Sequence, residues 1–202
     1  MDYEHFCIVL SGPSGVGKTT ISRRLLEMDD NLALSISFTT RKCKAGEIEG
    51  LHYFFVDEDK FEYLIASRAL LEYTYVYGNY YGTARETLEC FFEKGKDVIL
   101  DIDFEGALNF KRILGPRSLL IYLLPPTLLE LKKRLENRMR EDEKEISKRF
   151  SEFKDEFKYF PLYDYWIIND DLESAVNDIS NIINCERMRI KRLVNLPEGF
   201  FK

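Results

Sequence analysis

The sequence predicts an α/β fold with a mainly parallel sheet, and three observations favour it. Short apolar runs with almost no polar residue recur along the chain, as is typical of strands buried on both faces of a sheet. Amphipathic helical patterns lie between or after these runs. A glycine-rich turn joins the first run to the first helical pattern. This alternation is typical of helices layered around a parallel sheet.

The core elements can be placed in order along the chain. The first strand is expected at residues 6–10, and the helix after it carries Ile21, Leu25 and Met28 on one face. Three further strands are expected at 98–100, 119–123 and 166–168. Polar or proline residues stop these three strands: Asp101 and Asp103, Pro125 and Pro126, and Asn169 to Asp171. The basic stretch 187–192 is expected to be the solvated end of the last helix.

Residues 35–94 depart from this alternation and contain a hairpin signal. Three tyrosines, Tyr73, Tyr75 and Tyr77, alternate with Glu72 and its neighbours, and Gly78-Asn79 suits a two-residue turn. The tyrosines are therefore expected to pack on one face while Glu72 points to the other. Thr83 is followed three residues later by Glu86, a capping-box pattern that predicts a helix from Thr83 to near Gly95.

Residues 127–160 form a second departure, which reads as helical. Thr127 and Glu130 match another capping box. The apolar positions predict two helix faces: Leu128, Leu131 and Leu135, and then Ile146, Phe150, Phe153 and Phe157. The charged stretch 138–145 between them is expected to be a turn.

Composition limits the class of protein. The chain has 202 residues, 45% of them hydrophobic and 32% charged, which excludes a disordered or fibrous class. The net charge of −6 gives no reason to expect nucleic-acid or membrane partners. The longest apolar run, 119–124, is far shorter than the roughly 20 residues of a membrane helix, and the N-terminus lacks the pattern of a secretory signal. The four cysteines have no CxxC spacing, so we expect free thiols, no zinc site and a cytoplasmic location.

The strongest local signal is a phosphate-binding loop. The sequence Gly12-Pro13-Ser14-Gly15-Val16-Gly17-Lys18-Thr19 matches G-x-x-x-x-G-K-[ST] directly after the first predicted strand. Backbone N–H groups of such a loop wrap a phosphate, the Lys18 ammonium would reach the β- and γ-phosphates, and the Thr19 hydroxyl would bind Mg²⁺. We expect ATP to contact residues 12–19 and Thr20. The loop alone does not distinguish a switch, a motor or a kinase.

Further motifs behind this loop resemble guanylate kinase, a P-loop nucleoside monophosphate kinase. They are Thr39-Thr40-Arg41, Ala45-Gly46-Glu47, His52-Tyr53-Phe54-Phe55, Gly78-Asn79-Tyr80-Tyr81-Gly82-Thr83 and Ile99-Leu100-Asp101-Ile102-Asp103. The resemblance implies reversible transfer of the ATP γ-phosphate to GMP, and to dGMP, by a monomer or homodimer. It also implies a P-loop core with three layers (1–34, 95–126 and 161–202), a mixed α+β GMP-binding insertion (35–94) and a helical lid (127–160).

The resemblance assigns acceptor roles to particular residues, and the chemistry of guanine agrees. A carboxylate at Glu72 can accept from guanine N1–H and N2–H, and hydroxyls at Ser37 and Thr83 can donate to O6. The remaining GMP contacts would come from Arg41, Lys44, Tyr53 and Tyr81 around the phosphate, and from Gly82, Asp101 and Asp103. Asp101 could instead hold Mg²⁺ through water. Without the resemblance, Glu72 reads as a solvated strand carboxylate, and the two aspartates read as turn or capping residues.

The resemblance further implies lid arginines at Arg134, Arg138 and Arg149, which would act with Lys18 and Arg41 on the transferred phosphoryl group. Their default reading is that of solvated helix residues. No general base is needed, because the acceptor phosphate is already ionised, so His5 and His52 are expected to be structural. Two positions depart from the family pattern: Lys44 replaces an arginine, and Met139 follows Arg138 where glycine is usual.

Two other functions remain possible on the residues. One is a non-catalytic guanylate-kinase-like domain that binds protein partners, which the complete phosphate loop disfavours. The other is a P-loop kinase with a different small acceptor, which Glu72, Ser37 and Thr83 disfavour.

Overall fold

The core of the protein is a parallel sheet of five strands, seen here in a computed structural model that describes residues 2–76, 78–138, 153 and 156–196. The strand order is β10-β9-β2-β8-β3, and every neighbouring pair is parallel. The strands are β2 (Cys7–Ser11), β3 (Leu32–Leu34), β8 (Asp97–Asp101), β9 (Ser118–Leu124) and β10 (Tyr165–Ile168). The predicted mainly parallel sheet is confirmed. Strand β3 was not predicted.

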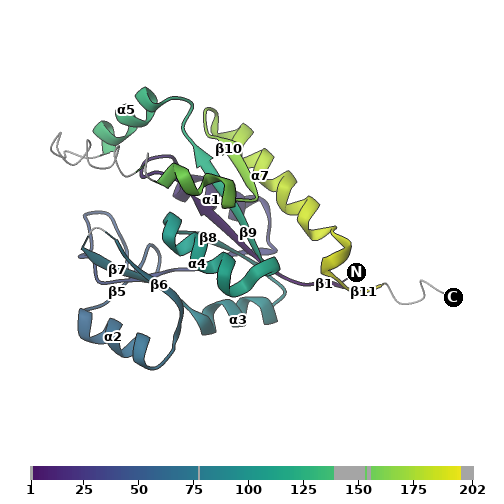
Figure 1. Cartoon of the computed structure of the whole chain (residues 1–202), viewed down its shortest axis with the longest axis horizontal. Helices are drawn as coiled ribbons and strands as arrows, with labels where there is room; N and C mark the ends of the chain where they lie inside the picture. Colours follow the sequence, from purple (N-terminus) through teal and green to yellow (C-terminus); the bar gives the residue numbers. More distant parts are fainter. Residues whose placement is uncertain (1, 77, 139–152, 154–155, 197–202) are drawn as a thin grey trace.

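Helices cover both faces of this sheet (Figure 1). On one face, α1 (Lys18–Met28) and α7 (Leu172–Arg187) pack against Ile8 and Leu10 of β2. On the other face, α3 (Arg85–Glu93) and α4 (Phe104–Leu114) pack against Cys7 and Val9. Alternate residues of one strand therefore enter different apolar layers, which is why β2 reads as a continuous apolar run. Met28, expected on the buried face of α1, is instead 48% exposed.

A second sheet has the order β5-β4-β7-β6 and lies beside the core (Figure 1). It contains β4 (Phe38–Thr39), β5 (Phe54–Phe55), β6 (Leu70–Val76) and β7 (Asn79–Ala84), with α2 (Glu58–Ala66) between β5 and β6. The predicted hairpin is confirmed, with Tyr75 opposite Tyr80 in an antiparallel pair, but Asn79, which was expected in the turn, belongs to β7 and pairs with Val76.

The two faces of β6 differ in burial, and Glu72 lies on the face opposite the tyrosines, as predicted. Glu72 and Thr74 are each 6% exposed, whereas Tyr73 and Tyr75 are 46% and 59% exposed. Tyr77 lies outside the described residues. The Tyr73 ring contacts the Phe61 ring and the Tyr75 ring contacts the Tyr80 ring, so the predicted packing role is confirmed for these two tyrosines, on the more exposed face of the strand.

Of the two predicted capping boxes, the one at Thr83 is wrong, and in the one at Thr127 the threonine caps its helix as predicted. Thr83 belongs to β7, and α3 begins two residues later at Arg85 without a side-chain cap. The Thr83 hydroxyl is engaged by Glu72 instead. Thr127 does cap α5 (Leu128–Arg138), since its Oγ1 accepts from Glu130 N–H at 3.1 Å.

The later helix of the predicted lid is only partly described. Residues 139–152, with Ile146, Arg149 and Phe150, lie outside the described residues. Phe157–Leu162 forms a 3₁₀ helix (η2) rather than part of an α-helix, and Phe157 is 45% exposed. Pro161 within this stretch cannot donate the N–H that an α-helix requires.

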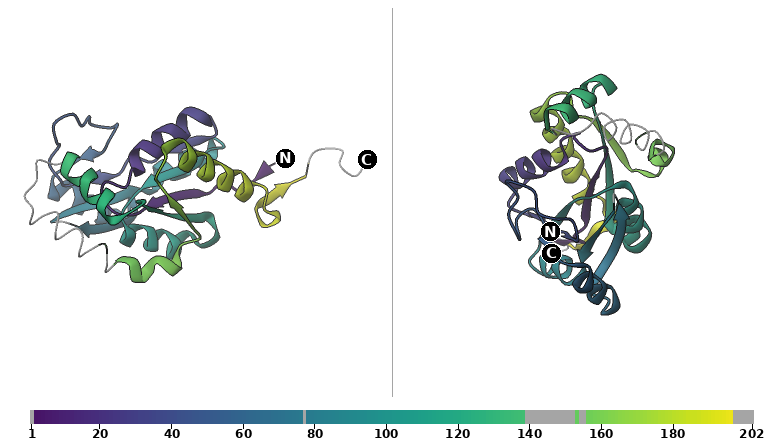
Figure 2. Two further views of the ribbon diagram at one scale, coloured as in Figure 1. Left: turned by 90° about the horizontal axis from the view of Figure 1, so that it is seen from above. Right: turned by 90° about the vertical axis from the view of Figure 1, so that its left-hand side faces the viewer.

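The first and last strands of the described residues pair at the end of the molecule that is far from α5 and the second sheet (Figure 1). Strand β1 (Asp2–Tyr3) pairs with β11 (Leu193–Asn195) in an antiparallel manner (Figure 2). Two further 3₁₀ helices are η1 (Gly115–Arg117) and η3 (Ile190–Arg192). Within the described ranges, no helix is long and apolar enough to cross a membrane.

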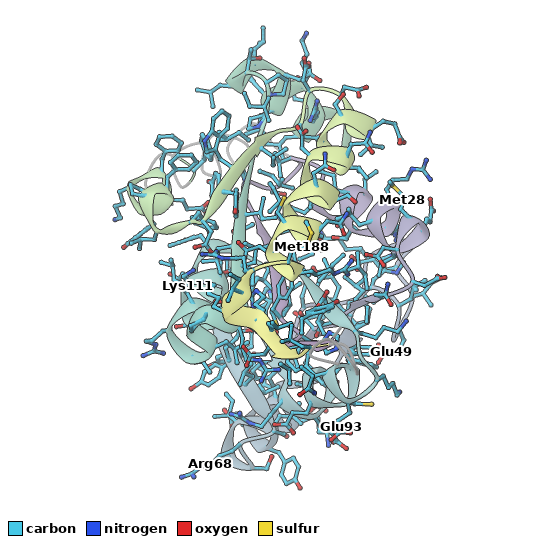
Figure 3. All side chains as sticks on the ribbon, turned by 90° about the vertical axis from the view of Figure 1, so that its right-hand side faces the viewer. Met28, Glu49, Arg68, Glu93, Lys111 and Met188 are labelled. Atoms are coloured by element: carbon cyan, nitrogen blue, oxygen red, sulfur yellow. The ribbon has the colours of Figure 1, made fainter. Side chains whose placement is uncertain are left out.

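The expectation that residues 187–192 are solvated is wrong for two of their arginines. Arg192 is 3% exposed, binds Glu186 at 3.1 Å and lies over the Phe6 ring. Arg187 pairs with Asp29 and with the buried Asp97. Met188, labelled near the end of α7 in Figure 3, is 75% exposed, so burial changes from residue to residue here.

Candidate active site

A cavity lies at the carboxyl ends of β2 and β8, between the core and the second sheet. The core contributes Gly12, Pro13, Ser14, Lys18, Asp101 and Asp103, and the second sheet and its loops contribute Ser37, Tyr53, Glu72, Tyr81 and Gly82. Residues predicted to contact two different nucleotides therefore line one cavity. The carboxyl edge of a parallel sheet is the usual location of a ligand site in such folds.

The phosphate-binding loop connects β2 to α1 in a conformation that needs glycine. Gly12 has a φ of +139°, and a Cβ placed on it would lie 2.4 Å from the carbonyl oxygen of Leu123. Helix α1 begins at Lys18, so Thr19 and Thr20 lie in its first turn. The Lys18 ammonium donates to the Gly12 carbonyl at 2.9 Å, which folds the side chain back across the loop. The open N–H groups of a helix start beside such a lysine can bind phosphate.

Thr19 and Asp101 meet at the base of the loop. Thr19 Oγ1 donates to Asp101 Oδ2 at 2.6 Å, and Lys18 Nζ lies 3.9 Å from Asp101 Oδ1. Within the described ranges, no three His, Cys, Asp or Glu side chains group to hold a metal. A hydroxyl and a single carboxylate nevertheless fit Mg²⁺, which in nucleotide sites takes one or two carboxylates together with phosphate and water oxygens.

Asp103 faces the second sheet rather than the phosphate loop. Its Oδ1 accepts from Gly106 N–H at 2.8 Å and caps α4, and its Oδ2 accepts from Thr74 Oγ1 at 3.0 Å. The alternative reading of Asp103 as a capping residue therefore holds, and the same side chain also lines the cavity. Asp103 thus joins β6 of the second sheet to a core helix.

Glu72 is a buried carboxylate with one oxygen left for a ligand. Its Oε1 accepts from Thr83 Oγ1 at 2.8 Å, while no partner of Oε2 is found among the described residues. Burial raises the pKa of Glu72 to about 7, the Thr83 hydroxyl opposes the rise, and the charge of Asp103 adds to it. The reading of Glu72 as a solvated strand carboxylate is wrong. A buried acceptor without a donor suits a ligand that brings N–H groups.

The other residues predicted to contact GMP differ in whether they line the cavity. Tyr53, Tyr81 and Ser37 line the cavity. The Arg41 guanidinium lies over the Tyr53 ring, 5.2 Å from its centre, and forms an ion pair with Glu47. Lys44 is exposed in the loop that follows Arg41. Burial raises the pKa of the Tyr53 phenol well above its usual value, so it remains a hydrogen-bond donor at neutral pH.

The three predicted lid arginines differ in what the structure shows. Arg134 binds Glu130 at 3.2 Å and donates to the Asn169 carbonyl at 3.1 Å. Arg138 is the last residue of α5. Arg149 lies outside the described residues.

Sequence reasoning missed Asn169, which supports the phosphate loop from β10. Asn169 is 7% exposed, and its Nδ2 donates to the Val16 carbonyl at 2.7 Å. A Cβ on Gly17 would lie 2.4 Å from the same Nδ2 atom. The only signal was its position directly after the predicted strand 166–168. Glu156, which also lines the cavity, gave no signal.

The chain is similar to known proteins over nearly its whole length. The guanylate kinase family model matches residues 5–186. A guanylate kinase of Clostridioides difficile is 43% identical over 96% of this chain and 95% of its own length, and one of Wolbachia pipientis is 44% identical over 92% of each. A crystal structure of guanylate kinase from Anaplasma phagocytophilum superposes with a TM-score of 0.80 at 33% identity, covering 96% of this chain and 93% of that one. A shikimate kinase of Bacteroides thetaiotaomicron, at 14% identity and a TM-score of 0.51, shares the fold alone.

Proposed function

This chain belongs to the guanylate kinase family and transfers a phosphoryl group from ATP to GMP, and from that premise we propose which of its residues perform each part of the reaction. One observation carries the proposal. Glu72, with one unpartnered oxygen, lines the same cavity as the phosphate loop. A guanine-recognising group and a phosphate-binding loop thus face one space.

On the donor side, the loop of residues 12–20 binds the ATP phosphates through its backbone N–H groups and the Lys18 ammonium. Lys18 already lies across the loop at Gly12 O, so it can turn to the phosphates without leaving the site. Thr19 and Asp101 are the residues that would hold Mg²⁺, Asp101 through water. When bound, the ion neutralises the charge of the β- and γ-phosphates.

On the acceptor side, the Glu72 carboxylate accepts from guanine N1–H and N2–H. Thr83 contributes by holding Glu72, because its single hydroxyl proton is donated to that carboxylate. Ser37, whose hydroxyl lines the cavity, supplies the donor to O6. Tyr53, Tyr81, Arg41 and Lys44 bind the phosphate of GMP, and Gly82 and Asp103 complete the pocket.

Transfer itself depends on position and charge rather than on a general base. The acceptor oxygen is already ionised, so cations must offset the repulsion between two anionic nucleotides. Lys18 and Arg41 supply part of this charge, and Arg134, Arg138 and Arg149 of segment 127–160 supply the rest by closing over the ATP phosphates. In this proposal residues 35–94 bind GMP, residues 127–160 form the lid, and residues 1–34, 95–126 and 161–202 form the core. We further propose Mg²⁺ dependence, use of dGMP, a cytoplasmic location and a monomer or homodimer.

The test is a coupled assay of ADP production with ATP and each of GMP, dGMP, AMP, CMP and UMP, with and without Mg²⁺. We expect turnover with GMP and dGMP only, and only with Mg²⁺. Turnover with AMP at the rate of GMP would contradict the role of Glu72. Full activity in the presence of a chelator would contradict the role of Thr19 and Asp101.

A further inference from the structure

The segment Ala45-Gly46-Glu47 has no role in the reaction as described so far, although Glu47 contacts a predicted phosphate-binding residue. We propose that Glu47 is a positioning residue for the acceptor phosphate: it fixes the Arg41 guanidinium so that one edge, with two N–H groups, is left for GMP. The inference rests on the proposed function, in which Arg41 binds that phosphate.

The hydrogen bonds of Arg41 define which edge is occupied. Glu47 Oε1 accepts from Arg41 Nη2 at 2.7 Å, and Glu47 Oε2 accepts from Nη1 at 3.0 Å. Nη1 also donates to the Lys42 carbonyl at 2.8 Å. These bonds use three of the five N–H groups of the guanidinium. Nε–H and the second Nη2–H share the other edge, and no partner for them is found among the described residues.

Glu47 is itself held in place, so it can serve as a reference point for Arg41. Its Oε2 accepts from Lys44 N–H at 2.8 Å, and its own N–H donates to the Lys44 carbonyl at 3.1 Å. The side chains of Arg41 and Glu47 are only 17% and 21% exposed. Burial opposes the charge of Glu47, but the hydrogen bonds from Arg41 and Lys44 hold its pKa below the usual value.

Aromatic rings hold the guanidinium from another direction. Its central carbon lies 5.2 Å from the centre of the Tyr53 ring and 5.7 Å from that of Phe55. Tyr53 lines the cavity, so the guanidinium lies against a residue of the nucleotide site. A planar group confined by rings, by a carboxylate on its Nη1–Nη2 edge and by a carbonyl at Nη1 offers its remaining Nε–Nη2 edge, which matches a phosphate in a bidentate manner. Without Glu47, the arginine would lose this fixed direction.

The experiment compares two ligands that differ only in the phosphate, GMP and guanosine, in Glu47→Gln. Glutamine keeps one acceptor but turns an N–H₂ group toward the guanidinium. We expect the dissociation constant of GMP to rise about tenfold, in the range of a lost charge-assisted hydrogen bond, while those of guanosine and of ATP stay within about twofold. Glu49→Gln is the matched control, since Glu49 is an exposed carboxylate of the same loop that accepts from Phe55 N–H and does not contact Arg41. It is labelled in Figure 3.

A double-mutant cycle with Arg41→Lys tests whether Glu47 acts through Arg41. If it does, Glu47→Gln adds almost nothing to the loss of GMP affinity in the Arg41→Lys background. Additive losses, equal weakening of GMP and guanosine, or tighter GMP binding by Glu47→Gln would overturn the proposal. If Glu47→Gln lowers the unfolding midpoint, the ratio of GMP to guanosine affinity in Glu47→Asp decides by the same criteria. Failure of the family reaction would show separately, as absence of GMP turnover by the unaltered protein.

Discussion

At the scale of single residues, Glu72 shows how recognition conflicts with stability. A carboxylate 6% exposed on the inward face of a strand loses most of its hydration, and burial raises its pKa to about 7 from a usual value of 4.5. Because the folded-state pKa is the higher one, the stability that this group contributes is fully present below about pH 4.5 and is lost as the pH rises through about 7. The folded protein is therefore least favoured in the ionisation state that binds guanine.

The same pKa predicts that GMP binding strengthens as the pH rises. Guanine N1–H and N2–H need an ionised acceptor, so protonation of Glu72 competes with GMP. For a pKa of about 7, the ionised fraction falls about tenfold between pH 8 and pH 6, and we expect the dissociation constant of GMP to rise accordingly. The measurement is calorimetric titration of GMP at several pH values.

The phosphate of GMP also titrates near pH 6, so a control must remove that contribution. Glu72→Gln binds the same phosphate but has no carboxylate at this position. The ratio of GMP affinities between the unaltered protein and Glu72→Gln should therefore fall toward low pH. A ratio that stays constant from pH 6 to pH 8 would contradict the role of Glu72 ionisation.

Lys18 gives a second prediction at this scale, because its ammonium donates a hydrogen bond to Gly12 O and lies at the longer distance of 3.9 Å from the Asp101 carboxylate. Lys18→Met should lower kcat by about 10²- to 10³-fold, as expected for loss of a cation that stabilises developing charge. Loss of a single hydrogen bond should lower the free energy of unfolding by only about 1 kcal/mol. Steady-state kinetics and urea unfolding check the two expectations separately. A kcat close to that of the unaltered protein would remove Lys18 from the mechanism.

At the scale of secondary structure, the sequence was most informative where one residue pattern had one physical cause. Strand β2 could be predicted because every one of its residues is buried. The period-two pattern also separated the two faces of β6, but it did not show that the face with Glu72 and Thr74 is the buried one, because aromatic residues are more often the ones turned inward. The sequence pattern around Thr83 also fits a helix cap, but in the structure the Thr83 hydroxyl donates its proton to Glu72 instead. Local patterns do not reveal such competition between a cap and a buried carboxylate.

The same limit explains why Asp101 and Asp103 could be found but not assigned separate roles. Asp101 is the last residue of β8 and Asp103 follows two residues later, and sequence alone places both at the carboxyl edge of the sheet. Their directions depend on groups distant in the sequence: Thr19 for Asp101, and Thr74 for Asp103. The residues of a site are therefore more predictable than the contacts that orient them.

Asn169 gives the prediction that belongs to this scale, because it connects the end of β10 to the loop before α1. Asn169→Ala removes the donor to the buried Val16 carbonyl, which costs about 1–3 kcal/mol of unfolding free energy when left unpaired. The Asn169 side chain contacts the phosphate loop, which binds ATP in the proposed reaction, whereas the second sheet carries the residues proposed to bind GMP. We expect the KM for ATP to rise several-fold and the KM for GMP to change little. Equal changes in both constants would show that Asn169 acts on the whole site.

At the scale of the whole molecule, the carboxyl and amino ends of the parallel strands have different roles. The carboxyl ends of β2 and β8 meet the cavity through Gly12 and Asp101. The amino ends meet a network around the fully buried Asp97, which accepts from Tyr3 OH, Phe6 N–H and Arg187 Nε. This network joins the first strands of the chain, β8 and the end of α7. Charges that stabilise the fold are thus kept a strand length away from charges that bind nucleotides.

That separation predicts a variant with lower stability and unchanged catalysis. Arg187 pairs with Asp97 at 2.7 Å and with Asp29 at 2.6 Å, and its side chain is 13% exposed. Arg187→Met leaves a buried carboxylate without its cation, which typically costs about 3–5 kcal/mol. We expect a clear fall in the free energy of unfolding in urea, while kcat and both KM values, measured well below the unfolding temperature, remain unchanged.

Arg24→Met is the matched control, since Arg24 of α1 also forms an ion pair that involves α7, an exposed one with Glu173. Water already solvates both of those charges, so its loss should change stability very little. If Arg187→Met and Arg24→Met destabilise the protein equally, the burial of Asp97 is not what gives the network its strength. If Arg187→Met lowers kcat at a temperature where the protein remains folded, the two edges of the sheet are coupled, and stability and catalysis cannot be changed independently in this fold.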